Sequence, residues 1–114
     1  MPPAELQPPL TPAVFFILFA LSDGEKHGYA IMQEVSKLSG NKFRMGPGTL
    51  YTTIQRLLDL DLIAETNASG ADTGRRRYYK LTRSGKSLFK MELSRMEALL
   101  RMAHTKNPAS EGAR

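Results

Sequence analysis

The sequence predicts a mainly α-helical fold with one small β-hairpin, an α+β architecture. Apolar residues recur at helical spacing in four segments, and two short segments of alternating polarity flank a turn-rich stretch. A chain of 114 residues with 41% hydrophobic residues can bury one modest core, so one domain is expected. The order helix, helix, helix, hairpin, long helix is that of a winged helix-turn-helix with a C-terminal extension.

Composition narrows the class of protein. The formal net charge of +5 favours polyanionic partners, and the absence of cysteine excludes disulfides, thiol catalysis and thiolate metal sites. The first nine residues are rich in proline and do not resemble a secretory signal. The longest apolar run, residues 13–21, is shorter than the roughly 20 residues of a membrane span. We therefore expect a cytoplasmic protein with no membrane segment.

The N-terminal part predicts a flexible arm followed by a very apolar helix. Residues 1–10 contain four prolines, and Thr11 is placed to cap a helix that begins at Pro12 and ends near residue 22. A helix that is apolar on nearly all sides has to be covered on several of them, which favours a second subunit. Three of its aromatic residues are expected at the subunit interface: Phe15, Phe16 and Phe19.

Two amphipathic helices are predicted next, over residues 28–39 and from Pro47 to about residue 59. Gly40 and Asn41 supply a stop signal after the former, and Gly46 is placed to cap the latter. The later helix has one apolar stripe, while its opposite side carries hydrogen-bonding groups. The stripe consists of Leu50, Ile54, Leu57 and Leu58.

The hairpin is predicted from two strands, residues 62–66 and 76–82, joined by turn residues. Alternation places Tyr79 and Leu81 on one face and Tyr78 and Lys80 on the other. The arm thus covers residues 1–10 and the winged helix-turn-helix domain residues 11–82.

The last helix is predicted over residues 83–106 as a dimerisation helix, followed by a disordered tail over residues 107–114. Its apolar residues form a heptad-like seam beside a second apolar row, a stripe wider than a two-helix seam needs. The residues of the stripe expected at the dimer interface are Leu88, Phe89, Met91, Leu93, Met96, Leu99, Leu100 and Met102.

The third helix is suited to the major groove of DNA. Small polar residues near a helix N-terminus can approach phosphates and base edges closely, Gln can pair with adenine, and Arg can reach guanine or phosphate. An ordinary solvated helix face is the alternative interpretation. The candidate DNA contacts on this helix are Gly48, Thr49, Thr52, Gln55 and Arg56.

The predicted wing adds a second signal. Arg75, Arg76, Arg77 and Lys80 place four cations in six positions beside a glycine-containing tip, which suits phosphate contact or insertion into the minor groove. Charge on an edge strand also prevents sheet-to-sheet aggregation, which is the alternative explanation. The two signals fall on neighbouring elements, and their coincidence favours DNA binding.

The sequence does not predict an enzyme. His27 and His104 are the only histidines, and with no cysteine there is no metal-ligand cluster and no nucleophile–base pair at a recognisable spacing. Asp59, Asp61 and Glu65 are expected to be solvated charges. We predict neither a metal nor a cofactor.

Four segments in order resemble the PadR family of transcriptional regulators: residues 27–31 (HGYAI), residues 48–51 (GTLY), Arg56-Leu57 with Leu62-Ile63, and residues 77–82 (RYYKLT) followed by Gly85. The resemblance implies a bacterial or archaeal homodimer, usually a repressor, whose first and last helices pack across a two-fold axis. It also implies DNA contacts by Tyr29, Thr49 and Tyr51. The single C-terminal helix is similar to that of the smaller members.

The sequence departs from the family pattern at three positions. Thr52 stands where the family commonly has Pro, Leu58 replaces a frequent Glu, and Asp61 occupies a usual Gly position that favours a left-handed backbone. The operator preference therefore stays open. Some relatives bind planar aromatic molecules near the dimer interface, so the resemblance also implies a small hydrophobic or aromatic effector beside the phenylalanines of the first helix and the methionines of the last.

Together these observations predict a sequence-specific transcriptional regulator, a repressor that binds a pseudo-palindromic operator in double-stranded DNA as a homodimer. Two alternatives stay open from the sequence. One is a winged-helix dimer that binds another protein, and the other is a small-molecule sensor without strong DNA specificity.

Overall fold

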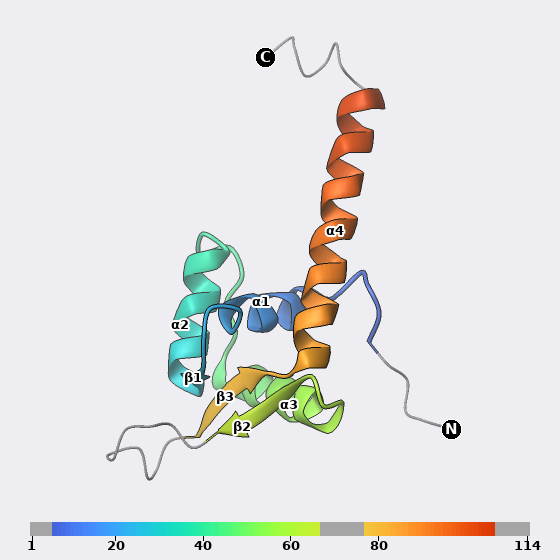
Figure 1. Ribbon diagram of the computed structural model, residues 1–114. Helices are drawn as coiled ribbons and strands as arrows, with labels where there is room; N and C mark the ends of the chain where they lie inside the picture. The colour runs from blue at the N-terminus through green and yellow to red at the C-terminus, as the bar shows by residue number, and fades with distance from the viewer. Residues whose placement is uncertain (1–5, 67–76, 107–114) are drawn as a thin grey trace.

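The structure is a computed structural model that describes residues 6–66 and 77–106. It has the predicted α+β winged helix-turn-helix fold, with one strand more than expected. Along the chain the elements are α1 (Pro12–Ala20), β1 (Lys26–His27), α2 (Gly28–Leu38), α3 (Pro47–Asp59), β2 (Ile63–Thr66), β3 (Tyr78–Leu81) and α4 (Arg83–Lys106). Figure 1 shows α1 in the middle, α3 with the sheet at one end, and α4 projecting far beyond the other elements.

The core surrounds α1. Thr11 caps this helix by accepting a hydrogen bond from the Val14 amide at 3.4 Å. The helix is covered by α2, α3 and α4 of its own chain. The buried residues of the core come from every helix and from both hairpin strands, and those of α1 are Val14, Ile17, Leu18 and Ala20.

The aromatic residues of α1 are largely covered from within the chain. Phe89 of α4 packs against Phe15 and Phe19, with ring centroids 5.7 and 5.5 Å apart, and Phe16 stacks on Phe43 at 5.8 Å. Phe15, Phe16 and Phe19 are half-buried as a result. Part of the cover that α1 needs therefore comes from α4 and the α2–α3 loop of its own chain, and the place of these three residues at a subunit interface stays a prediction.

Two of the residues predicted at the dimer interface also belong to this core. Leu88 and Phe89 are 5% and 8% exposed in the single chain. Leu88 and Phe89 are therefore core residues of the single chain and not interface residues, since the N-terminal third of α4 packs on α1 and the sheet. A heptad pattern does not distinguish an intramolecular neighbour from an intermolecular one.

Both helices of the helix-turn-helix end in the same hydrogen-bonded motif. After α2, the Asn41 amide donates to the carbonyl of Ser36 at 2.7 Å, and Gly40 has φ 62°. After α3, the Leu62 amide donates to the carbonyl of Leu57 at 2.9 Å, and Asp61 has φ 60°. These are Schellman ends, which place a left-handed residue just after the helix. The expectation of a left-handed backbone at Asp61 is confirmed.

The sheet contains three antiparallel strands in the order β1-β3-β2. Its register pairs Ile63 with Leu81 on one side of β3 and His27 with Tyr78 on the other. Tyr79 and Leu81 are buried, whereas Lys80 is exposed, as the alternation predicted. Strand β1 was missed, because two residues leave no periodic signal and their partner strand lies far away in the sequence.

Residues 6–10, which we predicted to be part of a flexible arm, are held against the domain. Leu6 and Leu10 are half-buried on the core. The Leu10 amide donates to a carboxylate oxygen of Glu92 at 3.0 Å, and Arg95 donates to both oxygens of that carboxylate at 2.6 and 3.0 Å. Among the residues that the structure describes, Glu92 is the charged residue that is buried, with 1% of its surface exposed. This carboxylate ties the chain before α1 to α4.

Replacing Glu92 with glutamine is expected to lower the free energy of unfolding by about 1 to 3 kcal/mol at neutral pH, because hydrogen bonds to a charged group are lost. The hydrogen bonds from Arg95, and then the one from Leu10, hold the pKa of Glu92 below its usual value against the opposing effect of burial. A depressed pKa stabilises the fold above the unfolded pKa, and this contribution disappears as the pH falls through the folded pKa.

Urea unfolding of the wild type and the Glu92→Gln variant from pH 7 down to pH 3 measures this effect. The difference in stability should shrink in acid. Glu97→Gln, on the exposed side of the same helix, is the matched control and should change little. A difference that stays constant over the whole range would contradict the account.

Candidate nucleic-acid interface

The polar side of α3 faces solvent. Leu50, Ile54 and Leu57 are buried beneath the helix, and Leu58 is half-buried, as the apolar stripe predicted. The opposite side is open along its whole length. The predicted contact residues on it are all exposed: Gly48, Thr49, Thr52, Gln55 and Arg56.

Hydrogen bonds within α3 organise part of this side. Gln55 donates from Nε2 to the Asp59 carboxylate at 3.0 Å, and the Thr53 hydroxyl donates to the carbonyl of Thr49 at 2.8 Å. An open hollow on the helix surface is bordered by Tyr51, Thr52, Gln55, Arg56 and Asp59. Arg56 is therefore the cation beside this hollow, while Asp59 engages one of the two N–H groups of the Gln55 amide.

The start of α2 lies next to α3. Tyr29 is 60% exposed and Tyr51 is 49% exposed, although both are large and partly apolar. His27 caps α2 by accepting a hydrogen bond from the Ala30 amide at Nδ1, 3.2 Å away. This capping role was not predicted, since the sequence pattern placed His27 only in the segment that resembles the second-helix motif of the PadR family.

The wing provides two described cations. Lys80 is exposed, and Arg77 is exposed and pairs with Glu65 across the hairpin at 3.7 Å. An exposed pair of this length contributes little to stability, so Arg77 can exchange its partner at small cost. Burial raises the pKa of Tyr79 on the inner face, and Glu65 adds to that effect. Arg75 and Arg76 lie outside the described residues.

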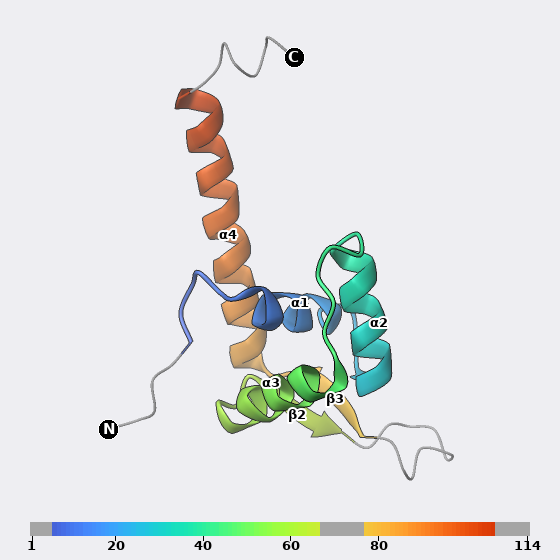
Figure 2. The same ribbon diagram turned by 180° about the vertical axis from the view of Figure 1, so that it is seen from behind.

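Figure 2 shows how these parts are arranged. The helix α3 and strand β2 lie side by side at one end of the molecule, and α4 extends away from that end. The exposed side of α3 and the base of the wing therefore belong to one end of the domain. Lys42 and Arg44, two exposed cations just before α3, were overlooked, although their spacing from Pro47 was available in the sequence.

The distal part of α4 carries an uncovered apolar stripe. Its residues are exposed in the single chain, in contrast to Leu88 and Phe89. Leu100, for example, is 58% exposed. The stripe contains the remaining α4 residues predicted at the dimer interface: Met91, Leu93, Met96, Leu99, Leu100 and Met102.

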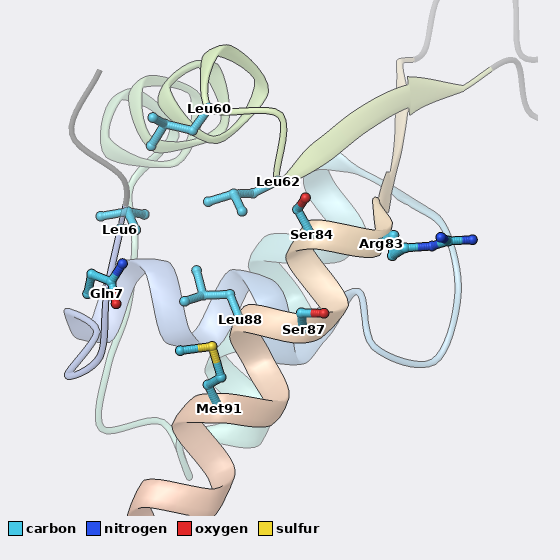
Figure 3. Close-up of a pocket in the computed structure, with 9 residues that line it drawn as sticks. All are labelled: Leu6, Gln7, Leu60, Leu62, Arg83, Ser84, Ser87, Leu88 and Met91. Carbon is cyan, nitrogen blue, oxygen red and sulfur yellow. The ribbon is translucent and has the colours of Figure 1, made fainter. Parts of the chain in front are cut away.

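One pocket lies between the N-terminal segment, the α3–β2 turn and the start of α4, with a volume of about 380 Å³. Figure 3 shows Leu60 and Leu62 of the α3–β2 turn and Leu88 and Met91 of α4 around this pocket, while Arg83 points away. The described lining includes Met91 but none of the phenylalanines that we expected beside an effector. Within residues 6–66 and 77–106, no three potential metal ligands come together, and no helix is long and apolar enough to cross a membrane.

The sequence is similar to those of two known proteins. An uncharacterised protein of Lysinibacillus sphaericus is 35% identical over 71 residues, which cover 62% of this chain and 65% of that protein. A transcriptional regulator of Mycobacterium tuberculosis is 33% identical over 85 residues, which cover 75% of this chain and 76% of that protein. The chain thus spans slightly less than two thirds of the length of the Lysinibacillus relative.

A solved structure extends the comparison to a nucleic-acid complex. Bacillus subtilis PadR in complex with operator DNA superimposes with a TM-score of 0.64 at 25% identity, covering 75% of this chain and 47% of that one. Residues 17–91 match the sequence profile of the transcriptional regulator PadR-like family. This match runs from α1 through the wing into α4, over well more than half of the sequence. The protein therefore belongs to the PadR-like family of transcriptional regulators.

Proposed function

We propose that this protein is a sequence-specific DNA-binding repressor that acts as a homodimer on a pseudo-palindromic operator in the cytoplasm. The main observation in support of DNA binding is that the exposed polar side of α3 lies at the same end of the domain as the wing. The operator complex of the Bacillus PadR supports DNA as the partner. A two-fold dimer places two such helices in major grooves about one helical turn or a multiple apart.

The residues divide by the kind of contact that their chemistry allows. Arg56 reads a base edge at the centre of the α3 face, with Thr49, Thr52 and Gln55 beside it. Tyr29, Lys80 and the arginines 75–77 contact the backbone, and the Gly48 backbone allows close approach. This division predicts different effects on specific and on random DNA.

The dimer is proposed from the distal part of α4. A contiguous exposed apolar stripe on a helix that projects from the domain is typical of an oligomer interface. A small hydrophobic or aromatic effector is part of the same proposal, because the pocket beside Leu60 and Met91 has a partly apolar lining and is large enough for one ring. Thermal melting with and without small aromatic compounds tests for it.

Arg56→Ala is expected to weaken binding to the operator by about 10-fold, since one base contact by arginine contributes about 1 to 3 kcal/mol, and to change binding to random duplex little. Fluorescence anisotropy on the upstream intergenic DNA and on a scrambled duplex, across a salt series, measures both. The paired variant Arg77→Ala with Lys80→Ala should weaken both duplexes alike and flatten the salt dependence.

Equal losses on both duplexes for Arg56→Ala would refute its role in base reading. A wild type with no preference for the intergenic DNA at any salt concentration would favour the alternative, a winged-helix dimer that binds another protein.

A further inference from the structure

Three elements of the DNA-binding end meet at one glycine. Gly28 is the first residue of α2 and is buried. A Cβ atom placed there would lie 2.7 Å from Cζ and 3.0 Å from Cε1 of Tyr51, and closer still to its hydroxyl oxygen. The phenol of α3 thus rests directly on the backbone at the start of α2.

A side chain is excluded at Gly28 because neighbouring atoms fill the space, and not because the backbone would be strained. Gly24 and Gly40 have left-handed φ values, but Gly28 does not. Alanine therefore fits the backbone of Gly28 and also suits a helix better than glycine. What it lacks is space, because the Tyr51 phenol already fills the place of the methyl group.

The wing is joined to the same point. His27, next to Gly28, pairs with Tyr78 in the β1–β3 ladder. The rings of these two residues meet edge to face, with centroids 5.3 Å apart and planes at 88°. The start of α2 is thus held by α3 through Tyr51 and by the wing through β1.

We propose that Tyr51 is a positioning residue. Its phenol ring packs on Gly28 and sets the spacing between the first turns of α3 and the start of α2. This spacing in turn places Tyr29 and the wing relative to the exposed side of α3. The inference rests on the proposed function and deepens it. It assigns Tyr51 a role different from the DNA contact that the family resemblance implies, because its ring packs against Gly28, although the residue is 49% exposed.

A double-mutant cycle between Gly28 and Tyr51 tests this role. Gly28→Ala displaces the phenol ring from Gly28 and should weaken operator binding by about 10-fold, within the range of coupling between residues in contact. Tyr51→Ala removes the ring and should weaken operator binding by a similar factor. In the Tyr51→Ala background, Gly28→Ala should cost nothing further, because its methyl group occupies the vacated space.

Tyr51→Phe separates positioning from direct contact. Phenylalanine keeps the ring on Gly28, so operator affinity should stay within about twofold of the wild type. A loss as large as that of Tyr51→Ala would show that the hydroxyl binds DNA and would overturn the proposal. Equal costs of Gly28→Ala in the wild-type and Tyr51→Ala backgrounds would overturn it as well.

A measurement without DNA keeps this inference separate from the proposed function. The Tyr51 ring should shift the NMR resonances of the Gly28 α-protons, and the shift should persist in Tyr51→Phe and vanish in Tyr51→Ala. If the wild type does not prefer operator over scrambled DNA, the regulator proposal fails while the ring shift still reports the contact. If the shift is absent, the positioning role fails whatever the protein binds.

Discussion

Gly85→Ala is expected to destabilise the protein by about 3 kcal/mol, the upper part of the range for overpacking a tight interior. A Cβ atom at this position, in the first turn of α4, would collide with the carbonyl oxygen of Leu62 and lie 3.1 Å from its carbon. That oxygen also accepts the Thr82 amide at 3.1 Å, so it cannot move without breaking the link between β3 and the α3–β2 turn.

The hydrogen bonds around Gly85 explain why the neighbouring backbone cannot move to make room for a methyl group. The Thr82 hydroxyl donates to the carbonyl of Asp61 at 2.8 Å and accepts the Gly85 amide at 3.0 Å, which caps α4 and fastens it to the end of α3. Gly85→Ala therefore strains the junction of three elements at once.

Urea unfolding measures the loss for Gly85→Ala. Gly48→Ala is the matched control, since Gly48 also lies in the first turn of a helix, but a methyl group added there would have no heavy atom within 4 Å. It should leave stability unchanged or raise it slightly. Similar stabilities for the two variants would contradict the proposed collision.

Leu100→Glu is expected to convert the proposed dimer to monomer at micromolar concentration. Leu100 lies in the exposed apolar stripe of α4, and in a two-fold dimer each subunit would bury an unpaired carboxylate. Losing the second half-site should weaken operator binding by about 10²-fold or more. Analytical ultracentrifugation gives the subunit mass, and anisotropy on the operator gives the affinity.

A second acidic substitution on the same helix serves as the control. Ser94 is exposed and lies off the stripe, so Ser94→Glu should leave the dimer intact. Thermal melting of both variants verifies that α4 is still folded onto α1. A Leu100→Glu protein that sediments as a dimer would exclude the distal part of α4 as the interface.

The helices were largely predictable because their signals are local. Thr11, Gly46 and Gly40 stand at or beside the helix ends that the structure shows, and the alternation from Tyr78 to Leu81 predicted the inner face of β3. Asp61 is a more demanding case: the left-handed backbone there was expected from a residue that replaces glycine, and φ is 60°.

Features that depend on distant partners were missed. Strand β1 exists only because β3 pairs with it, and the Glu92 carboxylate is buried only because the chain before α1 folds back over α4. In the sequence, the residues of β1 look like part of an exposed loop, and Glu92 looks like an exposed glutamate on a helix. No local pattern therefore predicts the strand or the buried carboxylate.

The sequence by itself determined the order of the helices and the two hairpin strands, the N-terminal residues of α1 and α3 and the polar face of α3, because each depends on residues within a few positions of one another. Only the tertiary structure decided which apolar residues the chain covers itself. Phe89 and Met102 belong to one predicted stripe, yet Phe89 packs on α1 and Met102 faces solvent. Periodicity identifies an apolar face, but what covers that face depends on how far the folded neighbours reach.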